Sequence, residues 1–322
     1  MTLNLSFIQA AIVFTVGLHL SATVAQTGAI KIIVGYPAGA TSDALTRVMA
    51  DGLSKRLNQA VIVENKPGAG GNLGGADAAR AAPDGYTIFM TTSGIQAINP
   101  VLYTKMPFDP NKDLMPVAPL VALNNVLVVH PAVKANSVKE FIALAKAQPN
   151  AISYASSGNG TSIHMSGELF KTQAGIDIIH VPYKGAGPAL ADLLAGQTSM
   201  MVDNLPSSMQ YIKSGKLRAL AVTSKNRVAE LPDVPTMIQS GYPNFDVTAW
   251  FGLFVPAGTP KPIIDKLYAA VKKSLETPEI KQRWKDLGGW AVGDTPANTK
   301  IFIAAEKKKW EQVAQQAKIE AE

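Results

Sequence analysis

Residues 30–57 read IKIIVGYPAGATSDALTRVMADGLSKRL, and this stretch decides the fold. Apart from Lys31, its first five residues are β-branched, which predicts a short buried strand over 30–34. A loop of small residues follows, and apolar side chains at helical spacing then predict a helix over 44–57. A strand, a loop and a helix in this order open an α/β unit with a mainly parallel sheet.

The same alternation continues along the chain. Further strands are predicted at 61–63, 87–91, 126–129, 152–154, 178–181, 198–202, 217–222 and 247–255, and helices at 74–82, 137–147, 163–174, 188–195, 207–214, 260–276 and 295–316. Ser137 is expected to cap its helix, with Glu140 completing a capping box, and Thr259 to cap the helix that starts at Pro260.

The pattern divides the chain into two lobes. A central α/β unit, 125–245, is inserted between 26–124 and 246–322, which together form the other lobe. The chain then crosses between lobes near 124–126 and near 243–247, and two such crossings make a hinge. We expect a two-lobed α/β fold of the periplasmic-binding-protein type, with a ligand in the cleft at the carboxyl ends of the strands.

The first 25 residues predict a cleaved secretory signal. Residues 7–20 form an apolar run too short to span a bilayer, and small residues up to Ala25 suit a signal peptidase. No Lys or Arg precedes the run, which departs from the usual form of a signal. The alternative is an uncleaved membrane anchor. We expect export to the periplasm.

Composition excludes several functional classes. The 322 residues carry a formal charge of +6 without a dense basic block, so a nucleic-acid partner is not expected. Cysteine is absent, which removes disulfides, thiolate metal sites and cysteine nucleophiles. The glycine-rich segment 67–75 fails the dinucleotide template because its third glycine position falls on Leu73. It is interpreted as a tight turn with close helix packing, and no cofactor is expected.

Two loops carry the predicted binding chemistry. Residues 37–43 and 156–162 each follow a strand, consist mostly of small residues and lead into a helix. The first amides of a helix have no intrahelical acceptor, so each loop could present unpaired amides to an anion. One loop from each lobe would clamp a carboxylate from both sides. The alternative is ordinary helix capping by Thr41 and Ser162, with no ligand.

Catalytic and metal sites are poorly supported. His164 and Glu168 lie one helical turn apart, but a zinc site needs a third ligand. His164 is expected either to line the cleft or to pack, and His180 to lie in the core. Asp203 follows a strand, where it could face the cleft or cap the next helix.

The chain resembles the Bug (TctC-like) receptors of tripartite tricarboxylate transport systems. The matching segments are YPAGATSDALTRVMA, VIVENKPGAGGNLGGADAARAAPDGYT, INPVLY, YASSGNGTSIHMSGELF, VPYKGAGPALADLLAGQ, VDNLPSSMQYIKSGKLRALAVTS and VPAGTPKPIIDKL. The resemblance implies a Venus-flytrap fold, a monomer without catalysis, a small carboxylate ligand held by the backbone of both loops, and a two-subunit membrane transporter as partner. Tyr36 stands where the family often has Phe, and Ala40 where a second Gly is common.

Together, the loops and the resemblance predict a set of ligand-binding residues. They are Tyr36, Pro37, Ala38, Gly39, Ala40, Thr41, Asp43, Thr92, Ser93, Ser157, Gly158, Asn159, Gly160, Thr161, His164 and Asp203. The identity of the acid is left open, although the absence of Arg from both loops disfavours citrate. Two other functions stay open: a sensor that signals to a membrane partner, and a hydrolase or isomerase that uses His164 and Asp203.

Overall fold

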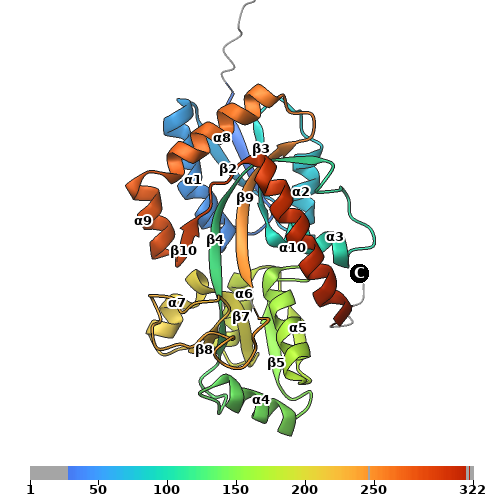
Figure 1. Cartoon of the computed structure of the whole chain (residues 1–322), viewed down its shortest axis with the longest axis vertical. Coiled ribbons are helices and arrows are strands. Elements are labelled where there is room, and N and C mark those ends of the chain that lie inside the picture. Colours follow the sequence, from blue (N-terminus) through green and yellow to red (C-terminus); the bar gives the residue numbers. More distant parts are fainter. Residues whose placement is uncertain (1–27, 246, 317–318, 320–322) are drawn as a thin grey trace, which may run out of the picture.

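The computed structural model describes residues 28–245, 247–316 and 319. The predicted signal segment therefore lies outside the described residues. Figure 1 shows two α/β halves stacked along the long axis, with strands passing from one half to the other. The two-lobed α/β fold expected from the sequence is confirmed.

The first half begins with the predicted strand–helix alternation. Its elements are β1 (Ile30–Val34), α1 (Thr41–Leu57), β2 (Val61–Asn65), a short 3₁₀ turn (Ala69–Gly71), α2 (Asn72–Ala79), β3 (Thr87–Thr92), a π-helical turn η2 (Gly94–Ile98) and α3 (Asn99–Leu102). Strands β2, β1 and β3 pair in parallel, and α1 packs on them through Leu45, Met49 and Leu53.

The second half repeats this pattern. Its elements are α4 (Val138–Ala147), β5 (Ser153–Ser156), α5 (Ser162–Ala174), β6 (Ile179–Pro182), α6 (Ala186–Leu194), β7 (Met200–Asn204), α7 (Leu205–Lys213) and β8 (Arg218–Val222). Strand β5 pairs in parallel with β6 and with β7.

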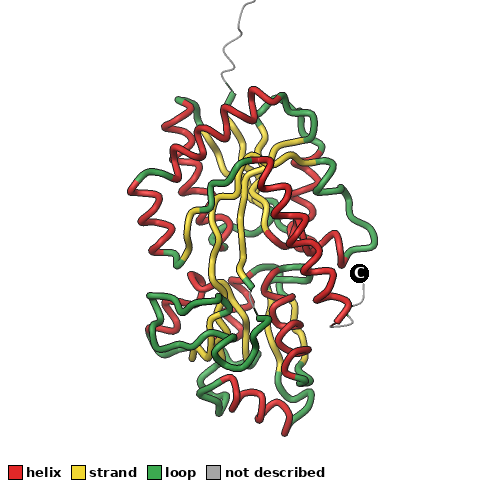
Figure 2. The backbone as a smooth tube through the Cα atoms, viewed as in Figure 1, coloured by secondary structure: helices red, strands yellow, loops and turns green. Residues whose placement is uncertain are grey.

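Two long strands join the halves: β4 (Leu114–Val129) and β9 (Thr248–Pro256). Strand β4 pairs with β9 as far as Asn124, and from Asn125 onwards it pairs with β7 and β8. Figure 2 shows both strands as continuous yellow segments along the long axis. All pairings of β4 and β9 are antiparallel, so the sheets are mixed rather than mainly parallel. The change of partner supports the predicted lobe limit at 124–125, which stays a prediction.

The C-terminal segment returns to the first half and then contacts both. Its elements are α8 (Lys261–Leu275), α9 (Pro278–Asp286), β10 (Gly289–Ala291) and α10 (Pro296–Gln316). Along α10, Ile303 packs near Phe89 and Trp250, whereas Trp310 joins the core that contains Phe170 of α5. Helix α9 and strand β10 were not predicted, although Thr277-Pro278-Glu279 carries the signals of a helix start.

Helix starts differ from the predicted ones by one to three residues, and the largest difference is at α1, which begins at Thr41 and not at 44. Ser137 caps α4 as predicted, and its hydroxyl accepts a hydrogen bond from the Glu140 amide at 3.2 Å. The alternative of helix capping by Thr41 and Ser162 is wrong, because both residues already lie inside their helices and the N-caps are Ala40 and Thr161. Thr259 is also not a cap, since its hydroxyl donates to the Pro256 carbonyl.

The described residues contain neither a helix suited to crossing a bilayer nor a group of His, Asp and Glu side chains placed to hold a metal ion.

Close packing of α5 on β5 depends on Gly167, which lies against the ring of Tyr154. A methyl group there would overlap the ring, so we expect Gly167→Ala to lower the free energy of unfolding by about 1–3 kcal/mol. Gly187 of α6 is the matched control: a Cβ there meets open space, so Ala should change the free energy of unfolding by less than about 1 kcal/mol. Urea unfolding of both variants checks this; equal changes would contradict the packing account.

Candidate functional site

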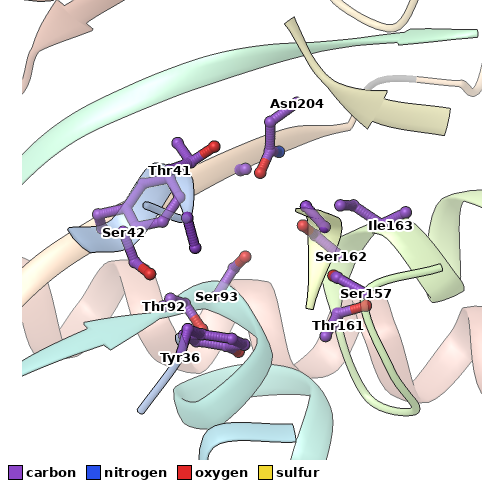
Figure 3. Close-up of a pocket in the computed structure, with 14 residues that line it drawn as sticks. Tyr36, Thr41, Ser42, Thr92, Ser93, Ser157, Thr161, Ser162, Ile163 and Asn204 are labelled. Carbon is purple, nitrogen blue, oxygen red and sulfur yellow. The ribbon is translucent and has the colours of Figure 1, made fainter. Parts of the chain in front are cut away.

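A small cavity lies between the two halves. Its volume is about 50 Å³, and the residues that line it are Tyr36, Ala40, Thr41, Ser42, Thr92, Ser93, Ser157, Thr161, Ser162, Ile163, Ala186, Asn204, Ala249 and Phe251. Figure 3 shows Ser42 and Ser93 from the first half facing Ser157 and Ser162 from the second. A cavity of this size holds about four water molecules.

Helix α1 directs its N-terminus at this cavity. The N-cap Ala40 is extended, at φ −70° and ψ 162°, and no side chain caps the helix. Thr41 and Ser42 are the first two helical residues, and both line the cavity. Amides in these positions have no acceptor within the helix. They are therefore donors available to a bound anion.

Helix α5 approaches from the opposite side in the same way. Its N-cap Thr161 is extended, and the Thr161 hydroxyl accepts a hydrogen bond from the His164 amide at 3.3 Å. The next two residues, Ser162 and Ile163, line the cavity. Their amides occupy the same two helical positions as those of Thr41 and Ser42, and the two helix starts line the cavity from opposite halves.

Two further helices begin at the cavity. Ala186 is the first residue of α6, and Asn204 is the N-cap of α7; both residues line the cavity. Each helix N-terminus carries about half a positive elementary charge. Four N-termini together make the cavity favourable for a carboxylate.

Among the described residues, the cavity lining contains no Lys, Arg, His, Asp or Glu. Hydroxyl groups and the amide of Asn204 supply its polar side-chain atoms, and Phe251 and Ile163 supply apolar surface. The Asn204 amide nitrogen donates to Asn125 Oδ1 at 2.8 Å, as the hydrogen-bond network assigns it, which ties the lining to β4. An anion here would depend on backbone and hydroxyl donors.

The side chain of Asp43 holds the loop before α1 in place through hydrogen bonds. This buried carboxylate accepts hydrogen bonds from the Gly39 amide at 2.9 Å, from Arg47 Nε at 3.0 Å and from Asn65 Nδ2 at 3.0 Å. Burial alone would raise the Asp43 pKa, but these hydrogen bonds and the Arg47 charge hold the pKa below its ordinary value. Asp43 thus stays ionised and fixes the loop, and it uses the Gly39 amide in doing so.

His164 holds the second loop, before α5, as Asp43 holds the first. Its Nδ1 accepts a hydrogen bond from the Gly160 amide at 3.3 Å, and its ring stacks on His180 with centroids 4.2 Å apart. Burial lowers the pKa of His164 to about 4 and that of His180 to about 3. Both rings are therefore neutral at neutral pH, as acceptance by Nδ1 requires.

Glycines let the two halves approach closely beside the cavity. A Cβ on Gly70 would lie 2.7 Å from the carbonyl oxygen of Asn159, and a Cβ on Gly94 would lie 2.8 Å from that of Gly160. Gly70 also has a positive φ of 61°. The glycine-rich segment 67–75 is thus a close-packed turn, as predicted, and it also contacts the opposite half.

Tyr36 links this segment to the cavity wall. Its hydroxyl donates to the Gly70 carbonyl at 3.0 Å and lies 3.3 Å from Thr92 Oγ1. Burial raises the pKa of Tyr36 to about 12, so the phenol keeps its proton.

The structure brings together only part of the predicted set of site residues. The predicted residues that line the cavity are Tyr36, Ala40, Thr41, Thr92, Ser93, Ser157 and Thr161, and those that do not are Pro37, Ala38, Gly39, Asp43, Gly158, Asn159, Gly160, His164 and Asp203. The lining residues that sequence reasoning missed are Ser42, Ser162, Ile163, Ala186, Asn204, Ala249 and Phe251. Correct placement of the two helix starts would have revealed the first three of these.

Asp203 does not face the cavity. The side chain is fully buried, its Oδ2 accepts a hydrogen bond from Ser208 Oγ at 2.7 Å, and no partner for its Oδ1 is found among the described residues. Successive side chains of a strand point to opposite faces, so Asn204 reaches the cavity and Asp203 does not. Burial raises the pKa of Asp203 to about 7.

Comparisons with known proteins agree on one family. The family model described as "Tripartite tricarboxylate transporter family receptor" matches residues 45–319. Protein BugT of Bordetella pertussis is 37% identical over 282 residues, which cover 87% of this chain and 86% of BugT.

Two solved structures from Rhodopseudomonas palustris are also similar. Rpa4515 with adipate is 34% identical with a TM-score of 0.87, over 89% of this chain and 96% of that protein. MatC with bound malate is 32% identical with a TM-score of 0.85, over 88% of this chain and 98% of MatC.

Replacing Asp203 by Asn should stabilise the protein in a pH-dependent way. The folded-state pKa of about 7 lies above the ordinary value of 3.8, so wild-type stability is lost as the pH rises through this window. The Asn side chain can still accept a hydrogen bond from the Ser208 hydroxyl, but it never ionises. We expect the advantage of Asp203→Asn to be about 2 kcal/mol larger at pH 8 than at pH 5.

Urea unfolding at the two pH values measures this difference. The exposed Asp233→Asn is the matched control and should follow the wild-type pH profile. An advantage of Asp203→Asn that is the same at both pH values would contradict the burial of an ionisable carboxyl at this position.

Proposed function

The chain belongs to the tripartite tricarboxylate transporter receptor family, and we propose that it is a solute-binding receptor that encloses a small carboxylic acid between its two halves. One observation carries the proposal: four helix N-termini meet at a cavity whose lining contains no charged side chain among the described residues. Unpaired amides at helix starts bind anions without a cationic side chain.

The ligand amides we propose are those of Thr41 and Ser42 on α1 and of Ser162 and Ile163 on α5. They replace the earlier candidates Gly39 and Gly160, whose amides are already bonded to Asp43 and His164. The other predicted site residues outside the lining then act by shaping the loops. Thr92, Ser93 and Ser157 supply hydroxyl groups to the ligand, whereas the Tyr36 hydroxyl already donates to Gly70.

Cavity size and charge restrict the acid. About 50 Å³ of space suits an acid with few carbon atoms. The similar structures with adipate and malate hold dicarboxylates, and we propose that this receptor takes a small mono- or dicarboxylate. Citrate would bring three carboxylates to a lining without Lys or Arg among the described residues.

The family suggests where and with what partner the receptor works. We propose that it acts as a monomer in the periplasm and delivers its ligand to a two-subunit membrane transporter. The lobes are 26–124 with 246–322, and 125–245, and β4 and β9 form the hinge between them. A sensor function would use the same cavity.

We propose a receptor without catalytic activity. The alternative of a hydrolase or isomerase requires His164 and Asp203 to act on the ligand, but neither side chain lines the cavity. His164 is engaged with Gly160 and His180, and Asp203 with Ser208. A bound acid is therefore expected to leave unchanged.

A thermal-shift screen tests the ligand class. The purified protein is heated with acetate, malate, succinate, adipate, benzoate or citrate at increasing concentrations. At 100 times its dissociation constant a ligand adds about 2.7 kcal/mol, or about 5 °C in Tm for a protein of this size. We expect a shift with at least one small acid and none with citrate. A shift with citrate alone would contradict the uncharged site.

Proline substitution at the first helical position tests the amides. Ser162→Pro removes one amide and the hydroxyl, whereas Ser162→Ala removes only the hydroxyl. Proline is tolerated at this position, and the preceding Thr161 already has the extended conformation that proline requires. We expect Ser162→Pro to weaken binding of the best acid by about 10-fold or more, because hydrogen bonds to charged groups contribute about 1.5–3 kcal/mol.

The pair Thr41→Pro and Thr41→Ala tests α1 in the same way, since Ala40 is also extended. Calorimetry with the acid found in the screen gives the affinities. If Pro and Ala have equal effects at both positions, the amides do not hold the ligand.

A further inference from the structure

A second, larger hollow adjoins the cavity and shares lining residues with it. It has a volume of about 310 Å³ and is lined by Gly39, Ala40, Thr41, Ala44, Ala186, Gly187, Leu190, Pro206, Ser207, Gln210, Tyr211 and Leu287. We call it the outer groove. Several of its residues, such as Gly39, Gly187 and Gln210, are exposed, so the groove opens to solvent.

The cavity and the outer groove share one wall. Ala40, Thr41 and Ala186 line both spaces. Ala40 and Ala186 carry only methyl groups, so Thr41 has the largest side chain of the three. A ligand that passes from the groove to the cavity must cross this wall.

Thr41 makes a direct bond to the opposite half at this wall. Its Oγ1 lies 2.8 Å from Ser207 Oγ, and 166 positions separate the two residues along the chain. Thr41 is the first residue of α1 in the first half, and Ser207 lies in the first turn of α7 in the second. Figure 1 places these helices on the same side of the molecule, one in each half.

We propose that the hydrogen bond between Thr41 and Ser207 is a latch that closes the cavity toward the outer groove, and that the groove is the ligand's portal. Thr41 would then have two functions. Its amide faces the bound acid, and its hydroxyl holds the opposite half in place. Ligand binding and closure are thereby coupled through one residue.

The role of Ser207 differs from that of a ligand-contacting residue. Ser207 lines the groove but not the cavity, so its hydroxyl stabilises the closed form without touching an enclosed ligand. Removing it changes the equilibrium between open and closed forms. That change lowers the apparent affinity for each enclosed acid by the same factor, mainly through faster release.

The binding arm of the test compares Ser207→Ala with Ser214→Ala. Ser214 follows α7 at its other end, and its hydroxyl donates to the Tyr211 carbonyl in the same half. We expect Ser207→Ala to weaken every acid that binds the wild type by about 2- to 10-fold, and Ser214→Ala to leave affinities unchanged. A loss confined to some acids would show that Ser207 contacts ligand, which contradicts the latch.

A disulfide trap tests the latch without a ligand. The chain contains no cysteine, so Thr41→Cys with Ser207→Cys introduces the only two thiols. The native oxygens lie 2.8 Å apart. Sulfur atoms in their places would therefore need only a small shift to reach the roughly 2.05 Å of a disulfide bond. Oxidation should give an intramolecular crosslink, visible as faster migration on a non-reducing gel. The control pair Thr41→Cys with Ser214→Cys should not form one.

The affinity comparison rests on the proposed function, because it needs an acid that binds. The crosslinking result does not, so a failure of the latch can be told apart from a failure of the proposed function. Absence of the crosslink, or an equal yield in the control pair, overturns the latch even if the receptor binds an acid. If the crosslink forms, acid loaded before oxidation should resist dialysis until a reductant is added. Free escape of the acid from the crosslinked protein would show that the portal lies elsewhere.

Discussion

Holding a carboxylate out of water without a cationic side chain requires hydrogen-bond donors that have no other acceptor. Here the first amides of α1 and α5 meet that requirement, because Ala40 and Thr161 are extended and the residues after them begin a helix. An isolated charge in a cavity without such donors would be strongly unfavourable. The other features of the site serve to keep these amides unpaired and facing each other.

Two buried side chains keep the loops in place. Asp43 holds the loop before α1 through the Gly39 amide, and its charge is balanced by Arg47. His164 holds the loop before α5 through the Gly160 amide. One support is an ionised carboxylate and the other a neutral imidazole, so the two halves reach the same backbone geometry by different chemistry. Gly70 and Gly94 then allow the halves to meet.

Local periodicity predicted most of the fold, but not the long strand β4. Its first part contains Pro116 and Pro119, and prolines argue against a strand. The structure accommodates them because the register with β9 shifts beside both residues. Likewise, the small-residue loops pointed to the right region, but the bonds that occupy the Gly39 and Gly160 amides exist only in three dimensions.

The choice between Asp203 and Asn204 shows the same limit. Both follow an apolar strand, and a polar side chain at either position could face a cleft. Pairing with β4 decides which one does, because neighbouring strand residues point to opposite faces. The sequence alone does not contain that pairing, and the buried Asp203 is the consequence.

A crystal structure of the protein with its bound acid tests the central claim most directly. The account predicts carboxylate oxygens about 2.7–3.1 Å from amide nitrogens of both helix starts, Thr41 or Ser42 on one side and Ser162 or Ile163 on the other. A carboxylate bound by a lysine or arginine side chain, or by the amides of one half only, would contradict it.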